Sequence, residues 1–157
     1  MTREELLFEA TRFRRAIEKA KAAGEFTPQQ FKPERINNFP YDCCDETADL
    51  FTHYLYHEFG TDSIRINASY YDKRLKRDCY HDWQETDGWL VDLTGDQFEN
   101  DPSIPIKAES IYVGKMDSFH RQFEIRWQEH SCGIECLGSG CWGRMYGLYN
   151  AIMKHVK

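Results

Sequence analysis

The stretch FPYDCCDETADLFTHYLYHEFG, residues 39–60, predicts an amphipathic helix that starts beside two adjacent cysteines. Helical steps forward from Cys44 reach four residues on one apolar line: Ala48, Phe51, Leu55 and Phe59. The Cys44 thiol therefore extends the face that should pack against the rest of the fold. Asp42 is the expected N-cap of this helix, and Gly60 is its expected C-terminal stop.

A thiol in the first turn of a helix lies near free backbone N–H groups and the positive end of the helix dipole, and both lower its pKa. The acidic neighbours Asp42, Asp45 and Glu46 act in the opposite direction. Cys44 therefore needs a basic partner elsewhere in the chain if it is to act as a nucleophile. Cys43 follows a different helical line, and we expect it to be a neighbouring or resolving thiol.

A β-hairpin within residues 79–94 can supply that partner. Asp87-Gly88 is a dipeptide favoured in two-residue hairpin turns, and residues 79–85 and 89–94 flank it as the two expected strands. With such a turn, His81 and Asp92 become diagonal neighbours on one face of the sheet. A turn one residue longer would abolish this register, so the prediction depends on the turn.

The 157 residues are 41 % hydrophobic, which predicts one domain with a substantial core. Thr2 and Glu5 form a capping-box pattern at the start of an expected N-terminal helix over residues 1–24. The remaining pattern predicts a loop over residues 25–38, strands over residues 64–70 and 110–113, and a C-terminal Cys/Gly loop and helix over residues 124–157. Phe119, Phe123 and Trp127 are spaced by four, which favours a core stripe at helical spacing. Together these elements predict the α+β class.

Charge and segment composition exclude several classes of function. A net charge of −6 and a pI near 5.5 argue against a general nucleic-acid binder or a binder of anionic membranes. The N-terminus lacks the build of a signal peptide, and no apolar run approaches the roughly 20 residues of a membrane span. We therefore expect a cytoplasmic protein with reduced thiols, no cofactor, and no nucleic-acid or membrane partner.

The order Cys44, His81 and Asp92 resembles the papain-like superfamily of cysteine hydrolases, particularly its NlpC-type and transglutaminase-like branches of small bacterial proteins. The resemblance covers roughly residues 37–123 and rests on four segments: Phe39-Pro40 before Cys44, His81-Asp82-Trp83, Asp92-Leu93-Thr94-Gly95-Asp96-Gln97-Phe98, and residues 117–123. It implies a small antiparallel sheet with the nucleophile-bearing helix packed on it. Residues 37–123 would then be the catalytic core.

The resemblance also implies a reaction. Cys44 would attack an amide carbonyl of a peptide or protein, His81 would take and return the proton, and Asp92 would orient His81. The thioester could lead to hydrolysis, deamidation or transfer, and the sequence does not choose among them. Five further residues are predicted to line the site: Cys43, Asn38, Trp83, Gln97 and His120. Asn37 and Asn38 are the candidates for a second oxyanion donor.

Three alternatives remain open at this stage. Cys44 could be an inert buried thiol, because cysteine is among the most often buried residue types. The fold could also be a catalytically inactive papain-like module that binds a partner. Finally, zinc could be held by four residues near the C-terminus, namely His130, Cys132, Cys136 and Cys141, although their spacing lacks the tight pairs of strong zinc motifs. The oligomeric state is not predicted.

Overall fold

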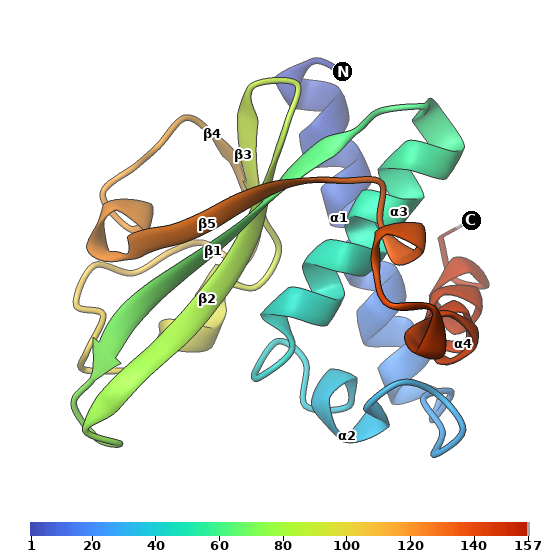
Figure 1. Cartoon of the computed structure of the whole chain (residues 1–157), viewed down its shortest axis with the longest axis horizontal. Helices are drawn as coiled ribbons and strands as arrows, with labels where there is room; N and C mark the ends of the chain where they lie inside the picture. The colour runs from blue at the N-terminus through green and yellow to red at the C-terminus, as the bar shows by residue number, and fades with distance from the viewer. Residues whose placement is uncertain (157) are drawn as a thin grey trace.

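The computed structural model describes residues 1–156 and contains one antiparallel sheet with its helices on one side (Figure 1). The α-helices are α1 (Arg3–Ala22), α2 (Pro33–Ile36), α3 (Cys44–Phe59) and α4 (Trp142–Met153). The strands are β1 (Ser63–Asp72), β2 (Arg77–Thr86), β3 (Trp89–Asp92), β4 (Tyr112–Gly114) and β5 (Glu124–Ser131), in the spatial order β4-β3-β2-β1-β5. Short 3-10 helices are η1 (Gly95–Phe98), η2 (His120–Gln122), η3 (Ile134–Cys136) and η4 (Ser139–Cys141). The predicted α+β class with a small antiparallel sheet is confirmed.

Helix α3 begins and ends close to the predicted positions. Gly60 closes it in the left-handed conformation, with φ 66°, as the glycine predicts. The N-cap is Cys43, which makes no side-chain capping bond, so the prediction of Asp42 as the cap is wrong. Asp42 lies one residue before the cap. Its backbone is left-handed, with a φ of 58°, whereas an N-cap residue usually has an extended backbone. No helix in residues 1–156 is both long and apolar enough to cross a membrane.

The β2–β3 hairpin has the two-residue turn that the sequence predicts. Asp87 and Gly88 both have positive φ, 49° and 78°, as the hairpin turn that matches strand twist requires. Thr86 pairs with Trp89 across the turn. At the other edge of the sheet, β5 pairs within residues 1–156 with β1 alone, and nearly all of its residues are exposed. Residues 124–131 are thus a strand, and the prediction that the C-terminal loop starts at residue 124 is wrong.

Two cores lie on the two faces of the sheet. The larger core joins α1, α3 and α4 to one face and includes residues such as Phe13, Phe51 and Leu148. The smaller core lies on the opposite face and is formed by Ile66, Ala68, Trp83, Leu90, Phe98, Ile104, Phe119 and Phe123. Much of this second core comes from residues 93–123, which cover that face of the sheet.

The predicted core stripe over Phe119, Phe123 and Trp127 is only partly correct. Phe119 and Phe123 are buried in the second core, whereas Trp127 is 39 % exposed on β5. The spacing of four does not belong to one helix, because the chain forms the 3-10 turn η2 and then enters a strand. A β-bulge at Arg126 then shifts the alternation, because Ile125 pairs with Ala68 and Trp127 with Asn67, so Trp127 points away from the second core.

Arg14 anchors the segment after β3 to α1. This residue is 8 % exposed, and its guanidinium donates to the carbonyl groups of Leu93 and Ser110, each at 2.7 Å. It also forms a two-pronged ion pair with the Asp96 carboxylate, at 2.9 and 2.7 Å. Paired donors of this kind hold a carboxylate in one orientation. The position of η1, which includes Gln97, therefore depends on Arg14.

Replacing Arg14 with Met tests this anchor. The variant leaves Asp96 and two carbonyl groups without their donor, and because Asp96 is 22 % exposed and can be hydrated, the expected cost is about 1 to 3 kcal/mol of unfolding free energy. Urea denaturation should show a loss of this size. Arg15→Ala is the control, because Arg15 is exposed on the next position of the same helix and should change stability by less than about 0.5 kcal/mol. Equal effects of the two variants would contradict the anchor.

Candidate active site

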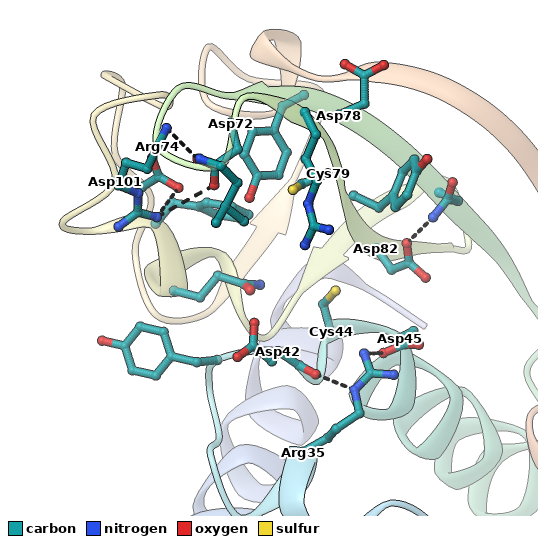
Figure 2. Close-up of a pocket in the computed structure, with 18 of the residues that line it drawn as sticks. Arg35, Asp42, Cys44, Asp45, Asp72, Arg74, Asp78, Cys79, Asp82 and Asp101 are labelled. Atoms are coloured by element: carbon teal, nitrogen blue, oxygen red, sulfur yellow. Dashed lines mark hydrogen bonds and ion pairs between the residues drawn. The ribbon is translucent and has the colours of Figure 1, made fainter.

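A cleft of about 790 Å³ opens between the start of α3, strands β1 and β2, and η1 (Figure 2). Its walls include Cys44 and Asp45 of α3, Asn67 of β1, and Gln97 and Phe98 of η1. Figure 2 shows the thiols of Cys44 and Cys79 projecting from α3 and β2 toward this space. The cleft thus presents the predicted nucleophile to a cavity large enough for a small ligand or a peptide side chain.

The surroundings of Cys44 favour its protonated form. Burial raises the pKa of the Cys44 thiol well above its ordinary value, and the carboxylates of Asp82 and Asp45 add to this increase. The backbone N–H of Asp82 and the Arg65 guanidinium lower the same pKa, but by less. The lower pKa expected for a thiol at a helix start is therefore not found, and Cys44 is a protonated thiol at neutral pH.

The walls of the cleft carry more negative than positive side chains. Six aspartates line it: Asp42, Asp45, Asp72, Asp78, Asp82 and Asp101. Three arginines, Arg35, Arg74 and Arg77, also line it. Arg35 pairs with Asp45 and Arg74 pairs with Asp101, both at 2.9 Å, so these arginines are already engaged with carboxylates of the wall. A cavity of this charge favours ligands that carry positive charge.

A buried network of two histidines and two aspartates lies in the second core. His81 Nε2 lies 2.7 Å from Asp92 Oδ2, and His120 Nε2 lies 2.9 Å from the same oxygen. His120 Nδ1 lies 2.6 Å from Asp117 Oδ1. Both nitrogens of His120 thus face carboxylates, so both act as donors and the ring is an imidazolium.

Electrostatics agree with this assignment of protons. Burial lowers the pKa of His120, but its hydrogen bonds to Asp92 and Asp117 outweigh burial and raise that pKa above its ordinary value. Burial likewise raises the pKa of Asp92, yet His81 and His120 together bring it well below the usual range. The backbone N–H of Thr94 also donates to Asp92 Oδ1 at 2.9 Å. Asp92 is therefore a stable buried carboxylate.

The structure brings His81 and Asp92 together as predicted, but it does not join them to Cys44. His81 Nδ1 contacts Gln97 Nε2 at 3.3 Å, and the His81 ring packs against Phe98 and other aromatic rings of the second core. Within residues 1–156 no hydrogen bond links Cys44 Sγ to His81. Gln97 contacts His81 and also lines the cleft that Cys44 enters. Gln97 thus contacts one of the two groups and lines the same cleft as the other.

The other predicted lining residues have different locations. Asn38 and Gln97 line the cleft, and Asn38 donates to Asp42 at 3.2 Å. Cys43 is buried in the larger core, where burial raises its pKa to about 12, so it does not serve the cleft as a resolving thiol. Trp83 and His120 are buried on the opposite face of the sheet and do not line the cleft. Asn37 donates to the Phe26 carbonyl at 3.1 Å and is likewise absent from the cleft walls.

The four zinc candidates do not converge on one point. His130 is exposed on β5 and contacts Asp62 at 2.9 Å, whereas Cys132 and Cys136 place their sulfur atoms 2.8 Å apart. Cys141 packs against the larger core. Two other groups in residues 1–156 place three ligand atoms within 4.8 Å of one another: His81, Asp92 and His120, and separately His53, His57 and Glu135. In the first group the side chains already bond to each other.

Sequence reasoning missed two carboxylates of this region. Asp82 lies next to His81 in the chain and pairs with Arg65 at 2.9 Å, and Asn67 also donates to it. The alternation of polar residues along β1 and β2 was the signal for this cluster, because Arg65, Asn67 and Asp82 share one face. Asp117 precedes His120 by three residues, a spacing that allows side chains to meet.

Comparisons of the chain with protein-family models, with curated proteins and with solved structures found no match.

The charged His120 predicts a pH-dependent contribution to stability. A histidine whose pKa is raised on folding stabilises the fold fully below its unfolded pKa of about 6.5, and this stabilisation is lost as pH rises through the higher folded pKa. His120→Gln should therefore cost most near pH 5 to 6 and progressively less toward pH 9. The measurement is the difference in unfolding free energy between wild type and variant across this range. A difference that does not change with pH would contradict a charged His120.

Proposed function

We propose that the protein is a cysteine-dependent amide hydrolase or acyl transferase, with Cys44 as nucleophile, His81 as base and Asp92 as the group that orients His81. The position of Gln97 carries this proposal. Gln97 lines the cleft with Cys44 and also contacts Nδ1 of a histidine whose Nε2 is held by Asp92. The resemblance of the sequence to papain-like hydrolases supports the same assignment.

The tautomer of His81 suits the role of a base. Asp92 is a carboxylate, so the 2.7 Å contact has His81 Nε2–H donating to it. Nδ1 then carries the lone pair, and the Gln97 amide donates to it at 3.3 Å. The nitrogen that can take a proton is thus the one that faces the residue lining the cleft. Proton transfer to Nδ1 would create an imidazolium that Asp92 already faces.

His81 packs in the second core, on the face of the sheet opposite to α3, so the reaction requires the Cys44 thiol to move into the place of the Gln97 amide at His81 Nδ1. The thiol proton would move to Nδ1, and the sulfur would attack the amide carbonyl carbon to form a tetrahedral oxyanion. The proton would then pass to the leaving amine as the thioester forms, and water or an amine would release the acyl group. The Gln97 amide, once freed from Nδ1, could donate to the oxyanion together with the Cys44 backbone N–H.

The charge of the cleft indicates which amides are preferred. Six aspartates line the cavity against three arginines, and two of the arginines are paired with those aspartates. Substrates with lysine, arginine or an amine near the reacting amide would gain from this field, while acidic peptides would be repelled. The proposed substrate class is therefore a cationic peptide or protein segment.

A second function has its own support. Burial, and then the carboxylates of Asp82 and Asp45, raise the pKa of Cys44. A cysteine nucleophile reacts as the thiolate, which a lowered pKa would favour. A cleft that binds a cationic ligand without reaction would account for both this raised pKa and the acidic walls. The thiol would then be part of the binding surface.

Site-resolved alkylation separates the two functions. If His81 takes the Cys44 proton, iodoacetamide at pH 7 should modify Cys44 at least about 10-fold faster in the wild type than in His81→Gln. The Gln side chain can still donate to Asp92 but cannot act as a base. Peptide mass spectrometry would follow Cys44, with Cys79 as the internal reference, because Cys79 lines the same cleft and its rate should be equal in both proteins.

Equal Cys44 rates in both proteins would refute His81 as its base and would favour the binding function. A second comparison uses Cys44→Ala and a library of fluorogenic peptide amides, half of them containing lysine or arginine. The proposed enzyme should release product from the cationic half, and the variant should release none. Full turnover by the variant would exclude Cys44 as the nucleophile.

A further inference from the structure

A second cluster of ligand-type side chains lies away from the cleft, where η3 packs against α3. His53 and His57 lie one turn apart on α3, and Glu135 approaches both from η3. His53 Nδ1 lies 3.0 Å from Glu135 Oε2, and His57 Nε2 lies 3.1 Å from Glu135 Oε1. The proposed hydrolase or transferase chemistry does not use these three residues.

The contact between His53 and Glu135 is not a satisfied hydrogen bond. The backbone N–H of Ile134 donates to His53 Nδ1 at 3.4 Å, so this nitrogen presents a lone pair and not a proton. Glu135 Oε2 is buried and has no hydrogen-bond partner. Two acceptors therefore face each other at 3.0 Å, which is unfavourable unless a cation lies between them.

We propose that His53, His57 and Glu135 form a binding site for a divalent transition-metal ion of the Zn²⁺ type. Imidazole nitrogen and carboxylate oxygen are ligands that such ions prefer. Bonds of about 2.0 to 2.1 Å in a tetrahedral site separate the ligand atoms by about 3.3 Å. The contacts of 3.0 and 3.1 Å, which involve the two different oxygens of Glu135, are close to this separation, and one ligand atom from each residue lies within 4.8 Å of the others.

The surroundings hold the three ligands in place and leave a path for the ion. Gly133 has a φ of 96°, and a Cβ at this position would lie 2.4 Å from His53 Cα, so only glycine lets η3 approach α3 this closely. The Tyr146 hydroxyl donates to Glu135 Oε1 and orients the carboxylate. Such partners of a metal ligand tune metal affinity. The His57 side chain is 43 % exposed, so an ion can enter from solvent.

Titration of the full-length protein with ZnCl₂ by calorimetry tests the site. The wild type should bind one Zn²⁺, and His57→Ala and Glu135→Gln should each bind at least about 10-fold more weakly. His57 is exposed, so its replacement should leave the fold intact, which circular dichroism would check. Tyr146→Phe should weaken binding by about 10-fold. His130→Ala is the matched control, because His130 is an exposed histidine that contacts Asp62 and should not change the affinity.

The neighbouring thiols require a separate comparison. Cys132 and Cys136 flank Glu135 in sequence and place their sulfur atoms 2.8 Å apart, so they could capture zinc themselves. The double variant Cys132→Ser with Cys136→Ser should keep the affinity of the wild type, and the Co²⁺-loaded protein should lack sulfur-to-cobalt charge-transfer absorption. The proposal is overturned if the wild type binds no Zn²⁺, if His57→Ala binds it unchanged, or if only the cysteine variant loses it.

Discussion

The Asp92 carboxylate is buried in an apolar core, and the arrangement of the candidate active site depends on how its charge is satisfied. An unpaired carboxylate in such a place would cost several kcal/mol, so the surrounding chain has to supply donors. Three donors come from three different segments: His81 on β2, the Thr94 N–H just after β3, and His120 on η2. The same carboxylate therefore orients His81 and fixes the loop that covers the second core.

The distribution of protons in this network bears on mechanism. His120 lies between two carboxylates and carries the positive charge that balances one of them. His81 contacts the same Asp92 oxygen through Nε2, and its Nδ1 contacts the Gln97 amide. The two histidines therefore differ in their second partner, which is a carboxylate for His120 and an amide for His81.

Much of the fold was predictable because the deciding signals are local. Asp87-Gly88 specifies a two-residue turn, and the turn places His81 and Asp92 on one face of the sheet. Predictions failed where tertiary contacts decide the outcome. Asp42 has a left-handed backbone and lies one residue before the cap, and a bulge in β5 turns Trp127 away from the core that holds Phe123.

The relation between Cys44 and His81 shows the limit of sequence reasoning at the site itself. The order of residues predicts a direct contact, but the side chain of Gln97 occupies His81 Nδ1. Gln97 reaches that position because Arg14, 83 residues earlier in the chain, holds the neighbouring Asp96 and the backbone on either side. A contact between residues so far apart in the chain leaves no local pattern in the sequence that would predict it. The electrostatic balance at Cys44, where burial exceeds the effect of the helix start, also depends on distant residues such as Asp82.

Strand β5 leaves one edge of the sheet open, since it pairs with β1 alone and is exposed along nearly its whole length. Open edges with apolar side chains invite strands of other molecules, and Ile125 and Trp127 are both partly exposed here. The charged residues Glu124 and Arg126 alternate with them, and Glu129 follows on the same strand. A second molecule that extended the sheet at this edge would have to desolvate these charges. The composition of β5 therefore protects the protein from aggregation by strand addition, although its backbone groups remain free to pair.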